Sequence, residues 1–192
     1  VSHLDIFSRQ TDAASGATLH LDGGKPLSVE PAGCPEGTSI IVRDLFYNTP
    51  ARLKFMKQDR AEATAIAGLA AHIALSHPDI SFRLIKDGRE ELHTPGDGKP
   101  LSAVYAALGR DFALALVEVH GRDGQLAVDG FVTKPLAGRG TRGMQTFFVN
   151  GRFIKSQLLT AAVEEAYANR LMKGKFCLLY TSPSPRDSTS SR

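Results

Sequence analysis

The chain has 192 residues, 42% of them hydrophobic and 22% charged, with a formal net charge of +3 and a pI near 9.0. This composition is typical of a folded protein and excludes wholesale disorder, and the length allows one large or two small domains. No apolar run approaches the roughly 20 residues of a membrane helix and no signal-peptide pattern is present, so we expect a cytosolic protein without a membrane partner.

The first part of the chain has the pattern of β-strands. Leu4 and Ile6 alternate with polar neighbours, and Asp22-Gly23-Gly24 is a turn signal. The run "TSIIVRDLF" at 38–46 is rich in β-branched residues. We therefore predict one sheet in this segment, which ends before Pro50 because proline has no backbone N–H to donate.

A helix is predicted to follow this sheet. Asp59 is the expected N-cap, and Glu62 three residues later completes a capping-box pattern. Apolar residues then recur at helical spacing until Pro78, which ends the helix. His72 lies among them, and we expect it to be a packed residue rather than a ligand.

A hairpin and a linker come next. Residues 80–94 alternate on both sides of Asp87-Gly88, a dipeptide that suits a tight turn because glycine accepts a positive φ. The stretch "PGDGKP" at 95–100 holds two glycines and two prolines and has the composition of a linker. We predict a domain boundary here, between a first domain at 1–98 and a second at 99–176.

The second domain is predicted to be another sheet with helices on one face, so the whole chain is of the α+β class. In chain order its expected elements are a helix at 101–109 closed by Gly109, strands at 112–119 and 125–132, a hairpin at 145–155 turning at Asn150-Gly151, and a helix capped by Ser156. The inner face of that last helix is expected to consist of Leu159, Ala162, Val163 and Ala166.

Two groups of side chains bear on possible ligands. The two cysteines and six histidines show no metal-ligand spacing, so neither a metal site nor a disulfide framework is predicted. Cations gather in the second domain, and they are Lys134, Arg139 and Arg142 in a glycine-bearing loop and Arg152 and Lys155 beside the second hairpin. Such cations suit phosphate binding without base recognition, and an ordinary soluble loop is the alternative.

The stretch "DLFYNTPARLKF" at 44–55 predicts a chain that turns away from its sheet. Asn48-Thr49-Pro50 supplies short polar side chains and a fixed φ. Three aromatic residues are expected to be buried anchors that stabilise the fold by about 2 kcal/mol each. They are Phe46, Tyr47 and Phe55. Arg52 and Lys54 then lie at a solvated or interdomain surface, and direct nucleic-acid contact is the alternative.

Two stretches carry a resemblance to a known family. "GTSIIVRDLFYNTPARLKF" at 37–55 and "FFVNGRFIKSQLLTAAVEEAYANRL" at 147–171 resemble signature blocks of the MutL family of DNA mismatch repair proteins. The similarity runs from Val1 to Phe176. The first block is specific, because other ATPases of the superfamily keep the Gly-Thr but not the residues that follow. Leu53 departs from the family, where a second arginine is common.

The resemblance implies a fold in two parts. Residues 1–98 would form the C-terminal part of a GHKL-type ATPase domain, with a two-layer arrangement of sheet and helix. Residues 99–176 would form the transducer domain, with a βαβ crossover and a ribosomal-protein-like second-domain fold. The strands and helices expected from the residue pattern agree with this division without singling it out.

The resemblance also implies a nucleotide site. Gly37 and Thr38 match a Gly-Thr motif in which the threonine hydroxyl, with a water and an aspartate, holds the adenine ring. Without the resemblance, Gly-Thr is an ordinary turn and strand start. The family's aspartate, its water-activating glutamate, its magnesium-holding asparagine and its glycine-rich lid are not found in this sequence. We therefore expect a fragment that binds ATP poorly, with no catalytic residue and no metal ligand.

For the intact parent, the resemblance implies binding and slow hydrolysis of Mg-ATP. The N-terminal halves would close into a homodimeric clamp that links a MutS-type mismatch recognition protein to strand incision and excision. DNA would be bound without sequence preference along a positive groove that includes Arg152. The protein would be cytoplasmic in a bacterium and nuclear in a eukaryote.

Two other functions remain open from the residues. One is a non-enzymatic nucleic-acid-binding module in which the second domain acts alone. The other is the ATPase region of a different GHKL protein, such as a type II topoisomerase. The block "VNGRFIKS" after a hairpin disfavours the latter.

The last sixteen residues, "CLLYTSPSPRDSTSSR" at 177–192, hold five serines and two prolines. We expect a disordered tail here, because such a segment buries too little apolar area to offset its ordering entropy of about 1–2 kcal/mol per residue. The stretch also resembles a translated library adaptor. Our hypothesis is that it is not native coding sequence, which sequencing of the genome across residue 177 would test.

Overall fold

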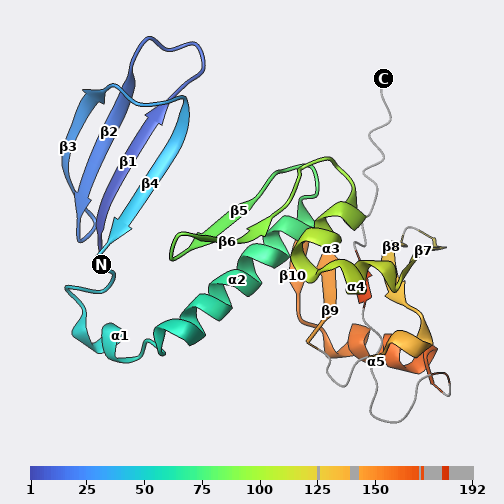
Figure 1. Ribbon diagram of the computed structural model, residues 1–192. Coiled ribbons are helices and arrows are strands. Elements are labelled where there is room, and N and C mark those ends of the chain that lie inside the picture. The colour runs from blue at the N-terminus through green and yellow to red at the C-terminus, as the bar shows by residue number, and fades with distance from the viewer. Residues whose placement is uncertain (125, 139–142, 169, 171–178, 182–192) are drawn as a thin grey trace. The chain divides into compact units, whose positions relative to one another are not determined.

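The computed structural model describes residues 1–124, 126–138, 143–168, 170 and 179–181 (Figure 1). The chain divides into two compact units, Val1–Glu62 and Ala63–Arg192. This division lies within one helix, whereas the boundary between the predicted domains at 1–98 and 99–176 was placed in the linker-like stretch 95–100. Within the described ranges, no helix is long and apolar enough to cross a membrane.

The first unit contains a four-stranded antiparallel sheet in the order β3-β2-β1-β4. Its strands are β1 (His3–Arg9), β2 (Gly16–Asp22), β3 (Lys25–Ala32) and β4 (Gly37–Arg43). The predicted turn is confirmed, since Gly23 and Gly24 have φ values of +58° and +93°. One face carries cross-strand apolar neighbours, in which Ile6 lies opposite both Leu19 and Ile40.

The strand predicted at 38–46 ends earlier, at Arg43. Asp44 and Phe46 adopt φ values of +52° and +67°, a left-handed conformation that breaks strand pairing. The Phe46 N–H donates instead to the carbonyl of Val1 at 2.6 Å. Pro50 does not merely end the sheet but begins a short helix, α1 (Pro50–Lys54), which the sequence reasoning missed.

The long helix α2 (Asp59–Ser76) is confirmed with a different start. Asp59 is its first residue rather than its N-cap, because the N–H groups of Ala61 and Glu62 already donate to the Gln58 carbonyl. The Glu62 carboxylate accepts from the Lys57 N–H at 2.9 Å, two residues before Asp59, the partner that the capping box predicted. The helix ends before Pro78, as expected.

The second unit begins within α2 and continues into the predicted hairpin, β5 (Arg83–Lys86) and β6 (Arg89–His93). It turns at Asp87 and Gly88 with φ values of +49° and +74°. The helix α3 (Pro100–Leu108) follows and ends at Gly109, whose φ is +91°. Both predictions are confirmed.

The strand predicted at 112–119 is wrong in its first half. Residues 110–114 form a helix, α4 (Arg110–Leu114), in which Phe112 and Ala113 are buried. A helical turn places both of these consecutive apolar residues against the core, whereas a strand would direct them to opposite faces.

A five-stranded sheet forms the other layer of the second unit, in the order β10-β9-β11-β8-β7. Its elements are β7 (Leu116–Asp123), β8 (Leu126–Thr133), the 3-10 helix η1 (Pro135–Ala137), β9 (Gln145–Val149), β10 (Arg152–Ile154), α5 (Gln157–Ala166) and β11 (Leu179–Thr181). The predicted hairpin turn has Asn150 and Gly151 at φ values of +50° and +73°. β11 pairs parallel to β9, with β10 and α5 between them in the chain, but β11 lies beyond the predicted second domain at 99–176.

Two expectations for the end of the chain differ from this arrangement. Residues 179–181 form a strand although they belong to the predicted tail, because their backbone pairs with both β8 and β9. On α5, Leu159 and Val163 are half-buried, while Ala162 and Ala166 of the predicted inner face are exposed. The rest of the tail, at 177–178 and 182–192, lies outside the described residues.

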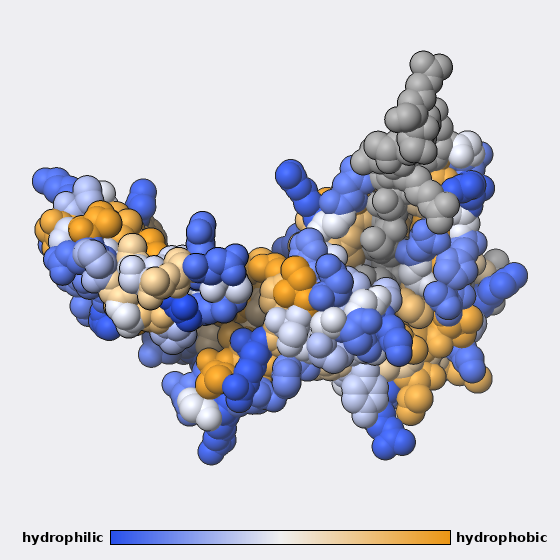
Figure 2. Space-filling model, turned by 90° about the horizontal axis from the view of Figure 1, so that it is seen from above, coloured by the Kyte–Doolittle hydropathy of each residue, from blue (hydrophilic) through white to orange (hydrophobic). Residues whose placement is uncertain are grey.

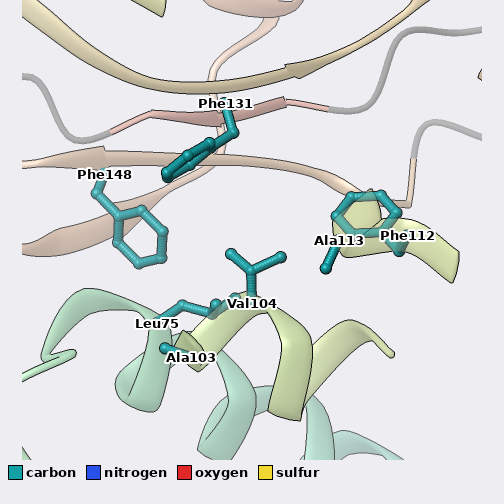
Figure 3. Close-up of a cluster of buried hydrophobic side chains, with 7 residues drawn as sticks. All are labelled: Leu75, Ala103, Val104, Phe112, Ala113, Phe131 and Phe148. Carbon is teal, nitrogen blue, oxygen red and sulfur yellow. The ribbon is translucent and has the colours of Figure 1, made fainter. Parts of the chain in front are cut away.

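The core of the second unit lies between its helices and its sheet. Figure 3 shows Phe131 and Phe148 from the sheet facing Val104 of α3 and Leu75 of α2, with α4 alongside. The cluster consists of Leu75, Ala103, Val104, Phe112, Ala113, Phe131 and Phe148. It joins residues from both sides of position 98, so α2 and the segment beyond it share one core.

Candidate nucleotide and nucleic-acid sites

Gly37 and Thr38, the residues predicted to contact a nucleotide, begin β4. Gly37 has a φ of +101°, which favours glycine at the entry to this strand. The Thr38 hydroxyl lies 2.9 Å from the Ser8 hydroxyl across the β1–β4 pair. Both are on the sheet face that carries Ile6 and Ile40, because Ser8 and Thr38 follow at alternate positions.

The chemistry of this position suits part of a nucleotide. Two uncharged hydroxyls can donate to and accept from the edge of a base, and the exposed side chain of Ile40 offers an apolar surface to a flat ring. The nearby guanidinium of Arg9 donates to the carbonyls of Cys34 and Ala13 at 2.8 and 3.3 Å. This position therefore offers uncharged hydrogen-bonding groups beside an apolar side chain.

Within the part of the chain that the structure describes, no group of three or more His, Cys, Asp or Glu side chains is placed to hold a metal ion. No residue is assigned to a metal here.

The opposite face of the same sheet carries a polar network that the sequence reasoning missed. The Asp5 carboxylate accepts from Arg43 and from His20, whose Nδ1 lies 2.7 Å away. Both hydrogen bonds lower the pKa of Asp5. The bond from His20 has the larger effect and the bond from Arg43 the next largest. The signal was present in the sequence, since polar residues occupy alternate positions of β1 and β2, but only the strand register brings them together.

This network continues to the segment 44–49. The Tyr47 hydroxyl donates to the Asp22 carboxylate, and this hydrogen bond raises the pKa of Tyr47. The Tyr47 ring also stacks on His3, with ring centroids 4.4 Å apart. The expectation that Tyr47 is a buried anchor is therefore wrong. Its side chain is half-exposed and holds the segment 44–49 to the sheet through a hydrogen bond and a ring contact.

Arg52 lies on α1 with an exposed side chain, as does Lys54. The expectation that Phe55 is a buried anchor is wrong for this chain, because its side chain is 87% exposed. The short helix α1 has no buried residue, so it gives Phe55 nothing to pack against. Apolar side chains at the surface are visible as orange patches in Figure 2.

Arg152 is the first residue of β10 and Lys155 follows the last, and both are exposed. Ser156 follows and caps α5 as predicted, accepting from the Leu159 N–H at 3.3 Å. A cavity of about 460 Å³ adjoins this segment. Its lining consists of Gln145, Phe147, Ile154, Lys155, Ser156, Gln157 and Thr160.

The loop cations cannot be placed in the same way. Arg139 and Arg142 lie outside the described residues, so their prediction stays a prediction. Lys134 is described and exposed, just before η1. The described part of the chain therefore brings together only Arg152 and Lys155 among the predicted cations of the second domain.

His72 is a packed residue, as expected. It is half-buried on α2, and its ring stacks on that of Phe153, with centroids 3.8 Å apart and planes inclined by 10°. Burial is the main cause that lowers the pKa of His72, and the positive charge of Lys155 lowers it further.

Comparison with known proteins identifies the family to which this chain belongs. A sequence model of the family described as DNA mismatch repair protein, C-terminal domain, matches residues 104–184. The DNA mismatch repair protein MutL of Agathobacter rectalis is 40% identical over 182 residues, which are 94% of this chain and 28% of that protein. MutL of Halothermothrix orenii is 41% identical over 180 residues, again 94% of this chain and 28% of that protein. The chain belongs to the MutL family of DNA mismatch repair proteins.

Solved structures show that the fold is shared as well. The Aquifex aeolicus MutL ATPase domain complexed with ADP has a TM-score of 0.77 and 24% identity, covering 96% of this chain and 68% of that one. The N-terminal domain of a DNA repair protein has a TM-score of 0.80 and 20% identity, covering 96% of this chain and 61% of that one. The predicted α+β fold is thereby confirmed. This MutL-family chain spans 28% of the length of the two relatives named above.

Proposed function

We propose that the chain is part of a MutL protein that couples the binding and slow hydrolysis of ATP to DNA mismatch repair. The observation that carries this proposal is the 40% identity to a MutL protein over 94% of the chain. In the whole protein, closure of a homodimer through its N-terminal halves connects a MutS-type mismatch recognition protein to strand incision and excision. The whole protein acts in the cytoplasm of a bacterium, or in the nucleus of a eukaryote.

We further propose the division of labour that the family resemblance implied. Residues 1–98 are the C-terminal part of a GHKL-type ATPase domain, and 99–176 are the transducer domain. The antiparallel sheet β3-β2-β1-β4 within 1–98, and a second sheet with strands β7 to β10 within 99–176, support this assignment.

Within the ATPase part, Gly37 and Thr38 contact the adenine of Mg-ATP in the whole protein. The exposed hydroxyl pair of Thr38 and Ser8 supports this role. The chain of 192 residues by itself does not turn over ATP, because its sequence contains no counterpart of the family's water-activating glutamate. Bound ATP would supply the free energy for the conformational change, and Thr38 would orient its base.

DNA is bound through phosphates without sequence preference. Its proposed contacts are Arg152, Lys155, Arg139, Arg142 and Arg52. The exposed positions of Arg152, the first residue of β10, and of Lys155, the residue that follows the strand, support this proposal, because cations close together on one segment can neutralise phosphates. Counterion release then makes the affinity fall with rising salt.

The test measures the affinity of the chain for a short random-sequence DNA duplex at several salt concentrations. The wild type is expected to bind with a clear salt dependence, and Arg152→Ala is expected to reduce the log–log slope by about 1. Arg122→Ala, at the end of β7 on the opposite edge of the sheet, is the matched control and should keep the slope. Equal effects of the two substitutions would refute the assignment of Arg152.

A further inference from the structure

The cationic segment around β10 is held by few main-chain contacts. This strand has three residues and lies at the edge of its sheet, where β9 is its one pairing partner among the described strands. A short edge strand with one partner frays easily unless its side chains are anchored. The orientation of Arg152 and Lys155 therefore depends on what holds the residues between them.

Phe153 is the middle residue of β10 and supplies this anchor. Its ring packs against the core and meets that of Phe148 edge to face, with centroids 6.1 Å apart. Phe148 is fully buried, so this contact is fixed from the sheet side. The adjacent Arg152 and the nearby Lys155 remain exposed.

His72 holds Phe153 from the helix side. Their rings are nearly parallel, with planes inclined by 10° and centroids 3.8 Å apart, so the flat face of the imidazole covers the phenyl ring. His72 is itself well placed, because Leu75 on the same helix is 1% exposed within the core of the unit. Phe153 thus lies between His72 of the helix α2 and Phe148 of the strand β9.

We propose that His72 is a positioning residue for nucleic-acid binding, which clamps Phe153 so that Arg152 and Lys155 present their charges in a fixed arrangement. This inference rests on the proposed DNA contact of Arg152 and Lys155. The role requires a flat ring at position 72 and no hydrogen bond from it. An aromatic replacement therefore retains the function, and a small or non-planar one loses it.

The test compares variants of the full chain in binding a fluorescent random-sequence DNA duplex. His72→Ala is expected to weaken binding about three- to tenfold, whereas His72→Phe stays within about twofold of the wild type. His77→Ala is the matched control, since His77 is an exposed histidine just beyond the end of α2, and it should leave binding unchanged. If circular dichroism shows that His72→Ala is unfolded, His72→Leu replaces it with the same expectation.

A double-mutant cycle separates positioning from general destabilisation. In an Arg152→Ala/Lys155→Ala background, His72→Ala should have no additional effect on DNA affinity, because the cations through which it acts are gone. An equal effect in both backgrounds, or a failure of His72→Phe to preserve binding, would overturn the proposal.

Hydrogen exchange gives a second readout that does not involve DNA. His72→Ala should speed the exchange of the β10 amides, including that of Phe153, and His72→Phe should not. Unchanged exchange in His72→Ala overturns the clamp. If the wild type binds no DNA but His72→Ala speeds the exchange of the β10 amides as expected, the proposed DNA contact is wrong. His72 then serves to anchor β10 only.

Discussion

Tyr47 attaches the segment 44–49 to the sheet through a polar contact. Its hydroxyl donates to Asp22, at the end of β2, and its ring stacks on His3, at the start of β1. A carboxylate that accepts this bond stabilises the protonated phenol, so the pKa of Tyr47 rises above its ordinary value of 10.0.

We therefore expect Tyr47 to ionise at a higher pH than a free tyrosine. Its titration is measured as the difference in phenolate absorbance between the wild type and Tyr47→Phe. Asp22→Asn should bring the pKa of Tyr47 back toward its ordinary value, because an amide does not repel the phenolate. Tyr105→Phe, which removes the hydroxyl of an exposed tyrosine on α3, is the comparison variant. An ordinary pKa for Tyr47 in the wild type would show that the bond to Asp22 does not persist in solution.

Gly16 is a second position at which one residue decides the local structure. A Cβ at Gly16 would lie 2.7 Å from the backbone oxygen of Ser8, and closer still to the sulfur of Cys34. The sulfur can move, but the backbone of β1 is fixed by its pairing. The close approach of β1 and Cys34 therefore excludes a larger side chain at Gly16.

Gly16→Ala is expected to lower the free energy of unfolding by about 1–3 kcal/mol, the usual cost of overpacking. Gly33→Ala is the control, since a Cβ there meets no described atom within 4 Å. Chemical denaturation followed by circular dichroism measures both. Equal stability of the two variants would mean that the sheet relaxes around the added methyl group.

At the scale of elements, the start of α5 depends on one side chain. The Ser156 hydroxyl accepts from the Leu159 N–H, which would otherwise lack a helical partner. Ser156→Ala should therefore lower the free energy of unfolding by about 1 kcal/mol, and Ser156→Asp should retain the cap. Thermal unfolding followed at a helix-sensitive wavelength is the measurement. A stability of Ser156→Asp as low as that of Ser156→Ala would contradict a capping role.

Elements were predicted well where local signals decide them. The turns at Gly23-Gly24, Asp87-Gly88 and Asn150-Gly151 were found because positive φ is a property of the residues themselves. The helix α4 was missed because the apolar run at 112–119 fits a strand equally well. Burial of the consecutive Phe112 and Ala113 decided in favour of a helix, and that burial depends on the rest of the core.

At the scale of the molecule, the second unit depends on one shared core. Phe148 is fully buried at its centre, between the sheet and the helices (Figure 3). Phe148→Ala should lower the free energy of unfolding by about 3–5 kcal/mol, since it removes a large buried ring and leaves a cavity. Leu136→Ala, at a side chain that is 99% exposed, should change it by less than about 0.5 kcal/mol. Urea unfolding of both variants is the measurement, and similar losses would contradict this account of the core.

The sequence by itself determined the family and most strands, helices and turns, because signature blocks, residue spacing and backbone preference are local properties. The tertiary structure alone decided that Tyr47 bonds to Asp22, that Phe55 is exposed and that β11 lies parallel to β9. It also brought His72 of α2 against Phe153 of β10. These contacts join segments far apart in the chain, and their free energies depend on register and packing, which no single stretch of sequence contains.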